Sequence, residues 1–511
     1  MPEGGHVVVI GGSIGGLCAA RALQSRFERI TILEQDVIPT EPAGRRGTPQ
    51  AWHNHFLLAA GREAIEKLFP GYLDRLLANG GAVLDPAYDA VNCLIDGWAP
   101  RSRGNSTMTF ASRLAIESTI REFVADDPGI TFIEQARVQN LTTRPGTDGR
   151  PVITGVEYRD EQGQIHSLEA EFVVDTAGRG SKAGSWMSEW GQEPELQTLD
   201  AKVSYSSRWY RWPEGDDNPW WRWLTTFPDP NPHAPEQHQY LCSINTIEND
   251  CFIAVMGSWG LDMPTDVESY EAAARQTRTR EFARMLDASK PITDVHHTRS
   301  TRNVWRRFDQ LSRPPRGFIA LGDSVCAFNP IYAQGMSCAA VGAVILRELS
   351  TQTDPLAEGF PKAFYAEQAK FLKGAWALAL TRDGAYAHAT GTEALPDGIR
   401  RRLLRKATWP VFQFVALASF EDQVIGDHFN RVFNLQETVQ DLAKNPRVLA
   451  GLAFYGVKLA LGLSKVPPRT DPQLPPSGAD RTGARDLPLR EVLAERRAAA
   501  RQKTGVVTAS V

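Results

Sequence analysis

The feature that most constrains the fold is a glycine-rich turn that joins an apolar strand to a helix at the N-terminus. The strand His6 to Ile10 runs directly into Gly-Gly-Ser-Ile-Gly-Gly, residues 11–16, and a helical segment follows. Such glycines allow a tight turn and close helix packing, with a pyrophosphate at the helix N-terminus. The next apolar strand ends at Glu34, near the offset of roughly 20 residues expected for a ribose-binding acid. We therefore predict a Rossmann-like dinucleotide-binding unit.

Ser13 occupies the position at which this turn usually has its middle glycine. Its side chain must point away from the phosphates of the dinucleotide or donate its hydroxyl to one of them. The strand before the turn, the helix after it and the acid downstream make the motif specific. We expect the cofactor-binding residues of this unit to be Gly11, Ser13, Ile14, Gly15, Gly16, Glu34 and Gln35.

A second strand, turn and helix occurs in residues 317–349. The apolar strand Phe318 to Leu321 ends at Gly322-Asp323, a proline-containing loop follows, and Gly335 begins a helix of small residues. A carboxylate accepts a hydrogen bond from a ribityl hydroxyl, and a helix N-terminus favours a ring edge that becomes negative on reduction. With the N-terminal unit, this segment predicts non-covalently bound FAD. A crossover without a cofactor is the alternative for the segment taken alone.

The composition excludes several other classes of protein. A net charge of −4 and a pI of about 6.2 give no electrostatic footprint for nucleic acid or anionic lipid. The six cysteines lack CxxC spacing, so we predict reduced packing residues and no metal site. Met1 leads to the first strand without a basic and apolar leader. We therefore expect a cytoplasmic protein.

The sequence predicts an α/β fold with a Rossmann-like FAD-binding domain, an inserted antiparallel β-sheet substrate domain and a C-terminal helical region. The FAD-binding domain is discontinuous, in residues 1–190 and 292–370. Residues 191–291 have aromatic-rich strands and form the substrate domain, and residues 371–466 are mostly helical. Residues 467–511 are rich in proline and charge and cannot bury enough apolar surface to fold. We predict that they form a disordered tail.

The helical region contains two apolar runs, residues 409–415 and 448–463. Neither reaches the 18 or so uninterrupted apolar residues of a spanning helix, and Lys458 interrupts the second run. We expect these helices to pack on the catalytic domains. Contact with a membrane surface is the alternative.

Three motifs occur in order along the chain and carry a resemblance to a known family. They are GRRGTPQAWHNH in residues 44–55, VVDTAGRGS in residues 173–181 and GDSVCAFNPIYAQGMS in residues 322–337. The set resembles the FAD-dependent epoxidases of the monensin and lasalocid type, relatives of squalene epoxidase within the group A flavin monooxygenase and halogenase superfamily. The resemblance covers roughly Val7 to Ser350.

The middle motif departs from the Asp-Gly pair of the aromatic hydroxylases in this superfamily. Asp175, Ala177 and Gly178 resemble the Asp-Ala-x-Gly version found in flavin halogenases, geranylgeranyl reductases and polyether epoxidases, with Thr176 in place of its alanine. This departure argues against transferring the phenol hydroxylase mechanism to the chain.

The resemblance implies a role for individual residues. Ser13, Ile14 and Gly15 would hold the pyrophosphate and Glu34 the adenosine ribose. The other implied contacts are Arg45 and Arg113 near the phosphates, the Val138 backbone near the adenine, Asp323 on the ribityl chain, and the backbone N–H groups of Gly335 and Met336 at the flavin C2 carbonyl. An ordinary solvated arginine is the alternative for Arg45 and for Arg113.

The sequence assigns no catalytic side chain, because the chemistry would come from the flavin; His53 and His55 are candidates. Alternate positions place both imidazoles on one side of an extended backbone, where they would face the flavin ring or the substrate. A structural role in anchoring the loop is the alternative. Trp221-Arg222-Trp223 is superficially similar to the WxWxIP element of flavin halogenases but lacks the Ile-Pro, so we favour an aromatic wall or core.

The resemblance implies an FAD-dependent monooxygenase. NADPH or NADH would reduce the flavin transiently, O₂ would add at its C4a carbon, and the hydroperoxide would epoxidise or hydroxylate a substrate without a protein base. The tryptophan-rich insert suits an apolar natural product such as a polyketide or a terpenoid.

Other functions stay open at this point. A flavin-dependent reductase of the geranylgeranyl reductase type and a flavin halogenase share the motifs, although Lys67 is a poor candidate for a halogenase lysine. The alternative without enzymatic activity is a flavin-bound interaction protein. The sequence leaves the substrate, the oxidised position, the choice between NADPH and NADH, and the oligomeric state undecided.

Overall fold

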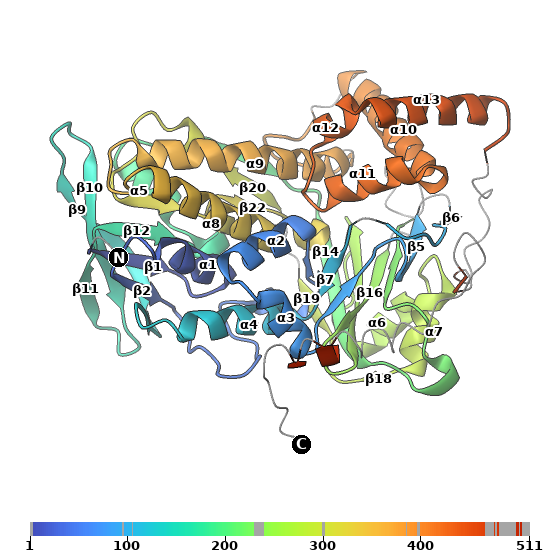
Figure 1. Ribbon diagram of the computed structural model, residues 1–511, viewed down its shortest axis with the longest axis horizontal. Helices are drawn as coiled ribbons and strands as arrows, with labels where there is room; N and C mark the ends of the chain where they lie inside the picture. Colours follow the sequence, from blue (N-terminus) through green and yellow to red (C-terminus); the bar gives the residue numbers. More distant parts are fainter. Residues whose placement is uncertain are drawn as a thin grey trace.

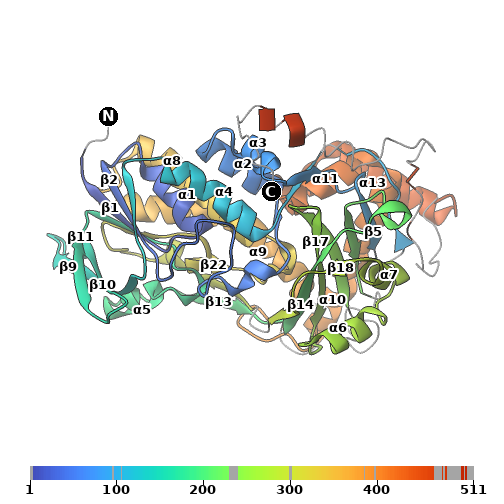
Figure 2. The same ribbon diagram turned by 90° about the horizontal axis from the view of Figure 1, so that it is seen from below.

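The chain forms two lobes, each built on its own large sheet (Figure 1). In Figure 1 the first lobe lies on the left and the second on the right, below the C-terminal helices; Figure 2 shows the same two lobes from below. The computed structural model describes residues 4–94, 97–104, 106–228, 240–298, 302–384, 386–395 and 399–464, together with residues 475, 478, 479, 497–499, 501 and 502.

The first lobe contains a five-stranded sheet whose strands all run parallel. Every residue of its central strand, His6–Ile10, and of the neighbouring strand Phe172–Asp175 is buried, as expected for strands covered on both faces. The predicted α/β, Rossmann-like fold class is therefore confirmed. In order across the sheet, the strands are β21 (Phe318–Ala320), β12 (Phe172–Asp175), β1 (His6–Ile10), β2 (Arg29–Leu33) and β8 (Ile130–Ile133).

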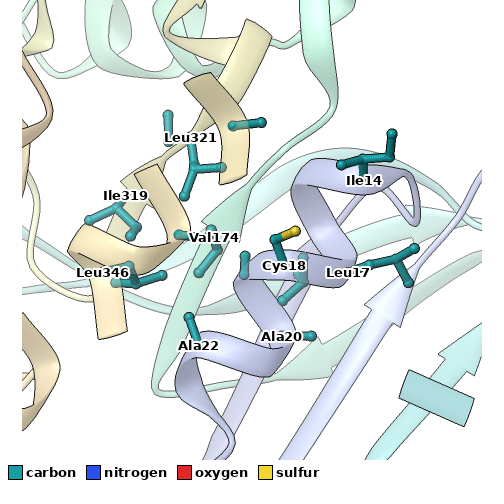
Figure 3. Close-up of a cluster of buried hydrophobic side chains, with 14 of the residues drawn as sticks. Ile14, Leu17, Cys18, Ala20, Ala22, Val174, Ile319, Leu321 and Leu346 are labelled. Atoms are coloured by element: carbon teal, nitrogen blue, oxygen red, sulfur yellow. The ribbon is translucent and has the colours of Figure 1, made fainter. Parts of the chain in front are cut away.

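Helices α1 (Ile14–Leu23) and α8 (Gly335–Gln352) pack against this sheet and against each other. Figure 3 shows the apolar cluster that joins them, with Cys18 on α1, Val174 on β12 and Leu346 on α8. All three side chains are fully buried. The same core therefore supports the helix after the N-terminal turn and the helix that follows Asp323.

Further helices and three small sheets complete the first lobe. The helices are α2 (Ala59–Leu68), α3 (Tyr72–Ala78), α4 (Arg113–Ala125), α5 (Ala183–Glu189) and α9 (Phe360–Asp383). In sheet order, the small sheets are β3 (Phe56–Leu57), β7 (Met108–Phe110) and β4 (Ala82–Leu84); β11 (Ile165–Glu169), β10 (Pro151–Arg159) and β9 (Arg137–Pro145); and β13 (Leu196–Leu199), β20 (Asn303–Arg306) and β22 (Cys326–Ala327).

The second lobe is built on an eight-stranded sheet that takes strands from distant parts of the chain. Its neighbouring strands are antiparallel except for β15 and β5, which run parallel. The strands in order are β18 (Lys290–Pro291), β14 (Val203–Arg211), β17 (Cys251–Trp259), β16 (Leu241–Ile247), β15 (Trp223–Thr226), β5 (Ala90–Leu94) and β6 (Gly97–Trp98), and β19 (His296–Thr298) also pairs with β14. Because β5, β6 and β19 lie outside residues 191–291, the sheet extends past both ends of the predicted substrate domain.

The tryptophans of the second lobe divide between the two faces of its sheet. Helices α6 (Val267–Ala274) and α7 (Arg280–Ala288) cover one face, and Trp212 and Trp221 lie in the core beneath them. Trp209 and Trp223 lie in other clusters, where they pack on residues of the first lobe: Trp209 contacts Trp52, and Trp223 contacts Phe56 and Phe110. The second face of the sheet therefore meets the first lobe through aromatic side chains.

The predicted C-terminal helical region is present. Within the described residues, no helix combines the length and the apolar run needed to cross a membrane. Most of the predicted disordered tail lies outside the described residues; of those described, Arg497 and Arg501 donate hydrogen bonds to the carbonyls of Gly81 and Ala78. The helices after α9 are α10 (Ile399–Glu421), α11 (Gln423–Phe433), α12 (Val439–Lys444) and α13 (Pro446–Ala460).

The core position of Trp221 predicts a large effect on stability. Trp221→Ala should lower the free energy of unfolding by about 3–5 kcal/mol, because it removes a buried aromatic side chain and leaves a cavity. Urea denaturation followed by circular dichroism measures this loss. The control Val411→Ala, at a side chain that is 62% exposed, should change the value by less than about 0.5 kcal/mol. Equal losses in the two variants would contradict the placement of Trp221.

Candidate functional site

The N-terminal turn brings glycine backbone and the Glu34 carboxylate together at the end of β1. Gly11 has a φ of +99°, a conformation that favours glycine, and its N–H donates to the Leu33 carbonyl. The Gly12 N–H donates to Glu34 Oε2 at 2.7 Å. A Cβ at Gly16 would lie 1.8 Å from the Gly11 carbonyl oxygen, so only glycine fits there. The turn therefore has the close helix packing that the glycine pattern predicts.

The Ser13 hydroxyl forms hydrogen bonds with two side chains of helix α4. It donates to Glu117 Oε2 at 2.8 Å and accepts from Arg113 Nη2 at 2.7 Å. The residue that replaces the middle glycine thus links the turn to the first turns of α4. Glu117 was not among the predicted site residues, and no spacing rule in the sequence connects it with Ser13.

Two arginines and two glutamates form a buried cluster beside this turn. Arg45 contacts both acids, with Nη1 at 2.7 Å from Glu34 Oε2 and Nη2 at 2.6 Å from Glu117 Oε1. Arg113 Nη2 lies 3.2 Å from Glu117 Oε2. All four side chains are 8% exposed or less, so neither arginine is an ordinary solvated one. The cluster places two guanidinium groups next to the N-terminus of α1.

The charges within the cluster favour the ionised form of Glu117. Burial opposes ionisation of Glu117, but the charges of Arg113 and Arg45 and the hydrogen bond from Ser13 outweigh it and lower the pKa of the Glu117 carboxyl. Burial lowers the pKa of Arg113, which the neighbouring Glu117 partly offsets. A ligand with phosphate groups would compete with these carboxylates for the guanidinium groups.

Asp323 and the N-terminus of α8 face each other, as the second segment predicts. A Cβ at Gly335 would lie 3.4 Å from Asp323 Oδ1. Among the described residues none donates a hydrogen bond to the Asp323 carboxylate, whose nearest cation is the Arg179 guanidinium at 4.0 Å. Burial raises the pKa of Asp323, while the charges of Arg179 and Arg113 act to lower it. A Cβ at Gly15 would lie 3.8 Å from Ala339 of α8 and from Leu321, so the N-terminal turn and the second segment lie side by side.

Buried polar atoms in the first turn of α8 also lack partners. Gln334 Oε1 and Ser337 Oγ are buried, and no hydrogen bond from the described residues reaches them. Such atoms are rare in folded proteins and call for an explanation such as a ligand or water. Together with the glycine turn and Asp323, they fit a site for a dinucleotide with a polar ring.

Asp175 and Thr176 of the middle motif connect the ends of the parallel strands. The Asp175 carboxylate is fully buried and accepts hydrogen bonds from the Ala177 N–H and from the Ser181 and Ser324 hydroxyls. Thr176 donates its hydroxyl to the Ile10 carbonyl at 2.7 Å. These bonds hold the ends of β1, β12 and β21 in register at one edge of the parallel sheet.

The two candidate histidines have different neighbours. His53 Nδ1 lies 2.9 Å from Ser207 Oγ on β14, and its ring meets Tyr205 edge-on. His55 Nδ1 lies 2.9 Å from the His53 carbonyl, and the charge of Arg113 acts on its ring. Burial is the largest cause that lowers the pKa of each to about 3. Both are therefore neutral at pH 7, and His53 links the loop after Arg45 to the second lobe.

The remaining predicted residues lie near the ends of β1 and β2 or, for Met336, in α8. The Ala136 N–H donates to the Glu34 carbonyl, which brings Val138 on β9 close to the end of β2. A Cβ at Gly47 would lie 2.7 Å from Gln35 Nε2, so the Gln35 side chain lies beside the loop after Arg46. Ile14 and Gly15 begin α1, and Met336 lies in the first turn of α8.

A cleft of about 470 Å³ opens between the segment Arg45 to His53 and strand β19. The Trp52 indole stacks on the His296 imidazole with ring centroids 4.9 Å apart. No sequence pattern indicates this pair, because its contact depends on the pairing of β19 with β14. The cleft is lined by Arg45, Arg46, Pro49, Trp52, His53, Val295, His296 and His297.

Known proteins share the fold of the chain. No protein-family model matches the sequence of this chain. Protein Rv3254 of Mycobacterium tuberculosis is 29% identical over 467 residues, which cover 88% of this chain and 93% of that protein. The flavin-dependent brominase Bmp2 is similar in structure with a TM-score of 0.58 and 14% identity, over 90% of this chain and 99% of the brominase.

A second solved structure is similar over a comparable length. HpxO of Klebsiella pneumoniae, complexed with FAD and uric acid, has a TM-score of 0.53 and 15% identity, over 84% of this chain and 97% of HpxO. At such low identity the likeness is one of fold. The chain therefore shares the fold of these two flavin-associated proteins over most of its length.

The close contact at Gly16 makes the turn testable. Gly16→Ala should abolish dinucleotide binding, because the added Cβ cannot fit beside the Gly11 carbonyl without moving the turn. The flavin retained after gel filtration, read from its visible absorbance, measures the effect. In the control Gly359→Ala the new Cβ meets no atom within 4 Å, and we expect the wild-type flavin content. Retention of flavin by both variants would show that the turn does not bind the cofactor.

Proposed function

We propose that the protein is an FAD-dependent monooxygenase that uses NADPH or NADH and O₂ to epoxidise or hydroxylate an apolar natural product. The observation that carries the proposal is that the helix after the glycine turn packs against α8, whose N-terminus faces the Asp323 carboxylate, while the turn itself is bonded to Glu34. The fold shared with a brominase and with an FAD-complexed protein supports the cofactor.

The residues of the site would bind the two halves of FAD separately. Glu34 would accept hydrogen bonds from the ribose, and the α1 N-terminus with Arg45 and Arg113 would bind the pyrophosphate. Asp323 would hold the ribityl chain, and the backbone N–H groups of α8 would face the ring. Bound FAD supplies the redox chemistry, namely hydride acceptance from the nicotinamide and activation of O₂.

The aromatic face of the second lobe would form the substrate wall. Trp223 is flanked by Phe56 and Phe110 and pairs across the sheet with Asn245 on β16. Trp223 Nε1 and Asn245 Nδ2 are both buried and have no hydrogen-bond partner among the described residues. A mainly apolar substrate with an oxygen atom facing these donors would fit such a wall.

A flavin halogenase is the second candidate, supported by the fold likeness to the brominase. Lys67 is exposed on α2 and its backbone carbonyl accepts a hydrogen bond from Arg347, so its place gives no support to a halogenase role. A geranylgeranyl reductase type of activity would need no O₂. A flavin-bound interaction protein would consume no nicotinamide in response to a small molecule.

Loss of the Asp323 carboxylate tests the cofactor assignment. Asp323→Ala should weaken FAD binding roughly ten- to a hundred-fold, because a hydrogen bond to a charged group contributes about 1.5–3 kcal/mol. Titration of the apoprotein with FAD, followed by flavin fluorescence, gives the Kd. The control Asp287→Ala removes a surface carboxylate that is 62% exposed and should leave the Kd unchanged. An unchanged Kd in Asp323→Ala would remove Asp323 from the site.

Isotope transfer tests the reaction. The purified protein should oxidise NADPH faster when an apolar alkene from a substrate panel is present, and one ¹⁸O atom from ¹⁸O₂ should enter the product. Mass spectrometry of the product and the change in absorbance of NADPH measure both. Halide-dependent product would indicate a halogenase, and product formed under anaerobic conditions would indicate a reductase. NADPH oxidation that no compound stimulates would favour the interaction protein.

A further inference from the structure

Asp383, the last residue of α9, lies at the meeting point of both lobes. Its side chain is fully buried. Oδ1 accepts hydrogen bonds from Trp259 Nε1 at 3.0 Å and from the Tyr332 hydroxyl at 2.7 Å. Oδ2 accepts from Asn303 Nδ2 at 2.7 Å and from Asn329 Nδ2. One carboxylate thus connects β17, β20 and the loop that leads into α8.

The four donors require an acceptor-only group at this position. Asn303 Oδ1 already accepts from the Asn329 N–H at 2.7 Å, and Asn329 Oδ1 accepts from the Ile331 N–H at 3.1 Å. Neither amide can therefore turn its oxygen away from these bonds without losing a backbone partner. A carboxylate offers about four lone-pair sites and no proton, whereas an amide would place its NH₂ group either against those of Asn303 and Asn329 or, when flipped, against the Trp259 N–H and the Tyr332 hydroxyl.

The loop held by Asp383 sets the position of the α8 N-terminus. Asn329 and Tyr332 belong to the short connection between β22 and Gly335. Within it, Ala333 has a φ of +56°, a conformation that costs energy for any residue but glycine and persists only where neighbours enforce it. Ile331 packs on β17 near Gly257. The Asp383 bonds at both ends of the 3₁₀ turn Pro330–Tyr332 supply this constraint.

We propose that Asp383 is a positioning residue that fixes the α8 N-terminus against the flavin ring edge and the aromatic face of the second lobe. This inference rests on the proposed FAD site. A helix N-terminus stabilises negative charge only within its first turn. Displacement of the loop should therefore weaken binding of reduced flavin relative to oxidised flavin.

The midpoint potential of bound FAD separates positioning from a direct effect of charge. Asp383→Asn removes a negative charge, and Asn303→Asp adds one; both break the pairing of donors with acceptors. We expect both variants to shift the potential to more negative values. A tenfold weaker relative binding of reduced flavin corresponds to about 30 mV. An effect of charge through space would instead move the two variants in opposite directions.

The double variant Asp383→Asn with Asn303→Asp provides the rescue. It returns one carboxylate to the pair and should recover part of the shift. Tyr332→Phe removes one donor without a change in charge and should give a smaller shift in the same direction, which keeps the test open if Asn303→Asp does not fold. The control Asp422→Asn makes the same chemical change at the N-cap of α11, and we expect no shift.

The outcomes distinguish this inference from the proposed function. If the wild-type protein binds no FAD, the proposed function fails. If the wild-type protein binds FAD but Asp383→Asn leaves the potential unchanged, or shifts it opposite to Asn303→Asp, the positioning role is wrong. Loss of stability in Asp383→Asn without a shift in potential, or loss of FAD that the double variant does not restore, would make Asp383 a purely structural residue and overturn the inference.

Discussion

The parallel pairing of β12 with β1 on one side and β21 on the other is the constraint on which the site depends. Parallel strands end at the same edge of their sheet, so Gly11, Asp175 and Asp323 meet there although they lie far apart in the sequence. Asp175 then bonds to Ser324 and holds the turn that carries Asp323. A change that shifted this register would separate the two halves of the proposed cofactor site.

Charge balance distinguishes the two ends of the site. At the Glu34 end, two guanidinium groups and two carboxylates compensate one another out of water, which keeps each charge from being buried alone. At the Asp323 end, the nearest described cation is the Arg179 guanidinium at 4.0 Å, and the carboxylate accepts no hydrogen bond from the described residues. The first end is therefore held together by the protein itself, whereas at the second end the buried Gln334 Oε1 and Ser337 Oγ have no hydrogen-bond partner among the described residues.

The sequence was sufficient for the parts that depend on local patterns. The glycine turn, the acid at the end of β2 and the pairing of Asp323 with Gly335 follow from residues close together in the chain. Contacts between distant segments were not predictable in this way. Glu117 and Asp383 look like ordinary helical acids in the sequence, and only the tertiary packing shows that each accepts hydrogen bonds from several elements.

The sharing of strands in the second lobe limits how this chain can be recombined. β5 pairs with β15 in parallel, with Ala90 opposite Trp223, and the last strand of the sheet in chain order is β19, so the sheet stays incomplete during synthesis until residues near 298 have emerged. A cassette of residues 191–291 moved into another protein would leave β5 behind and expose the edge of β15 to other chains. Changes in the chemistry of this sheet must therefore arise by substitution in place rather than by exchange of a module.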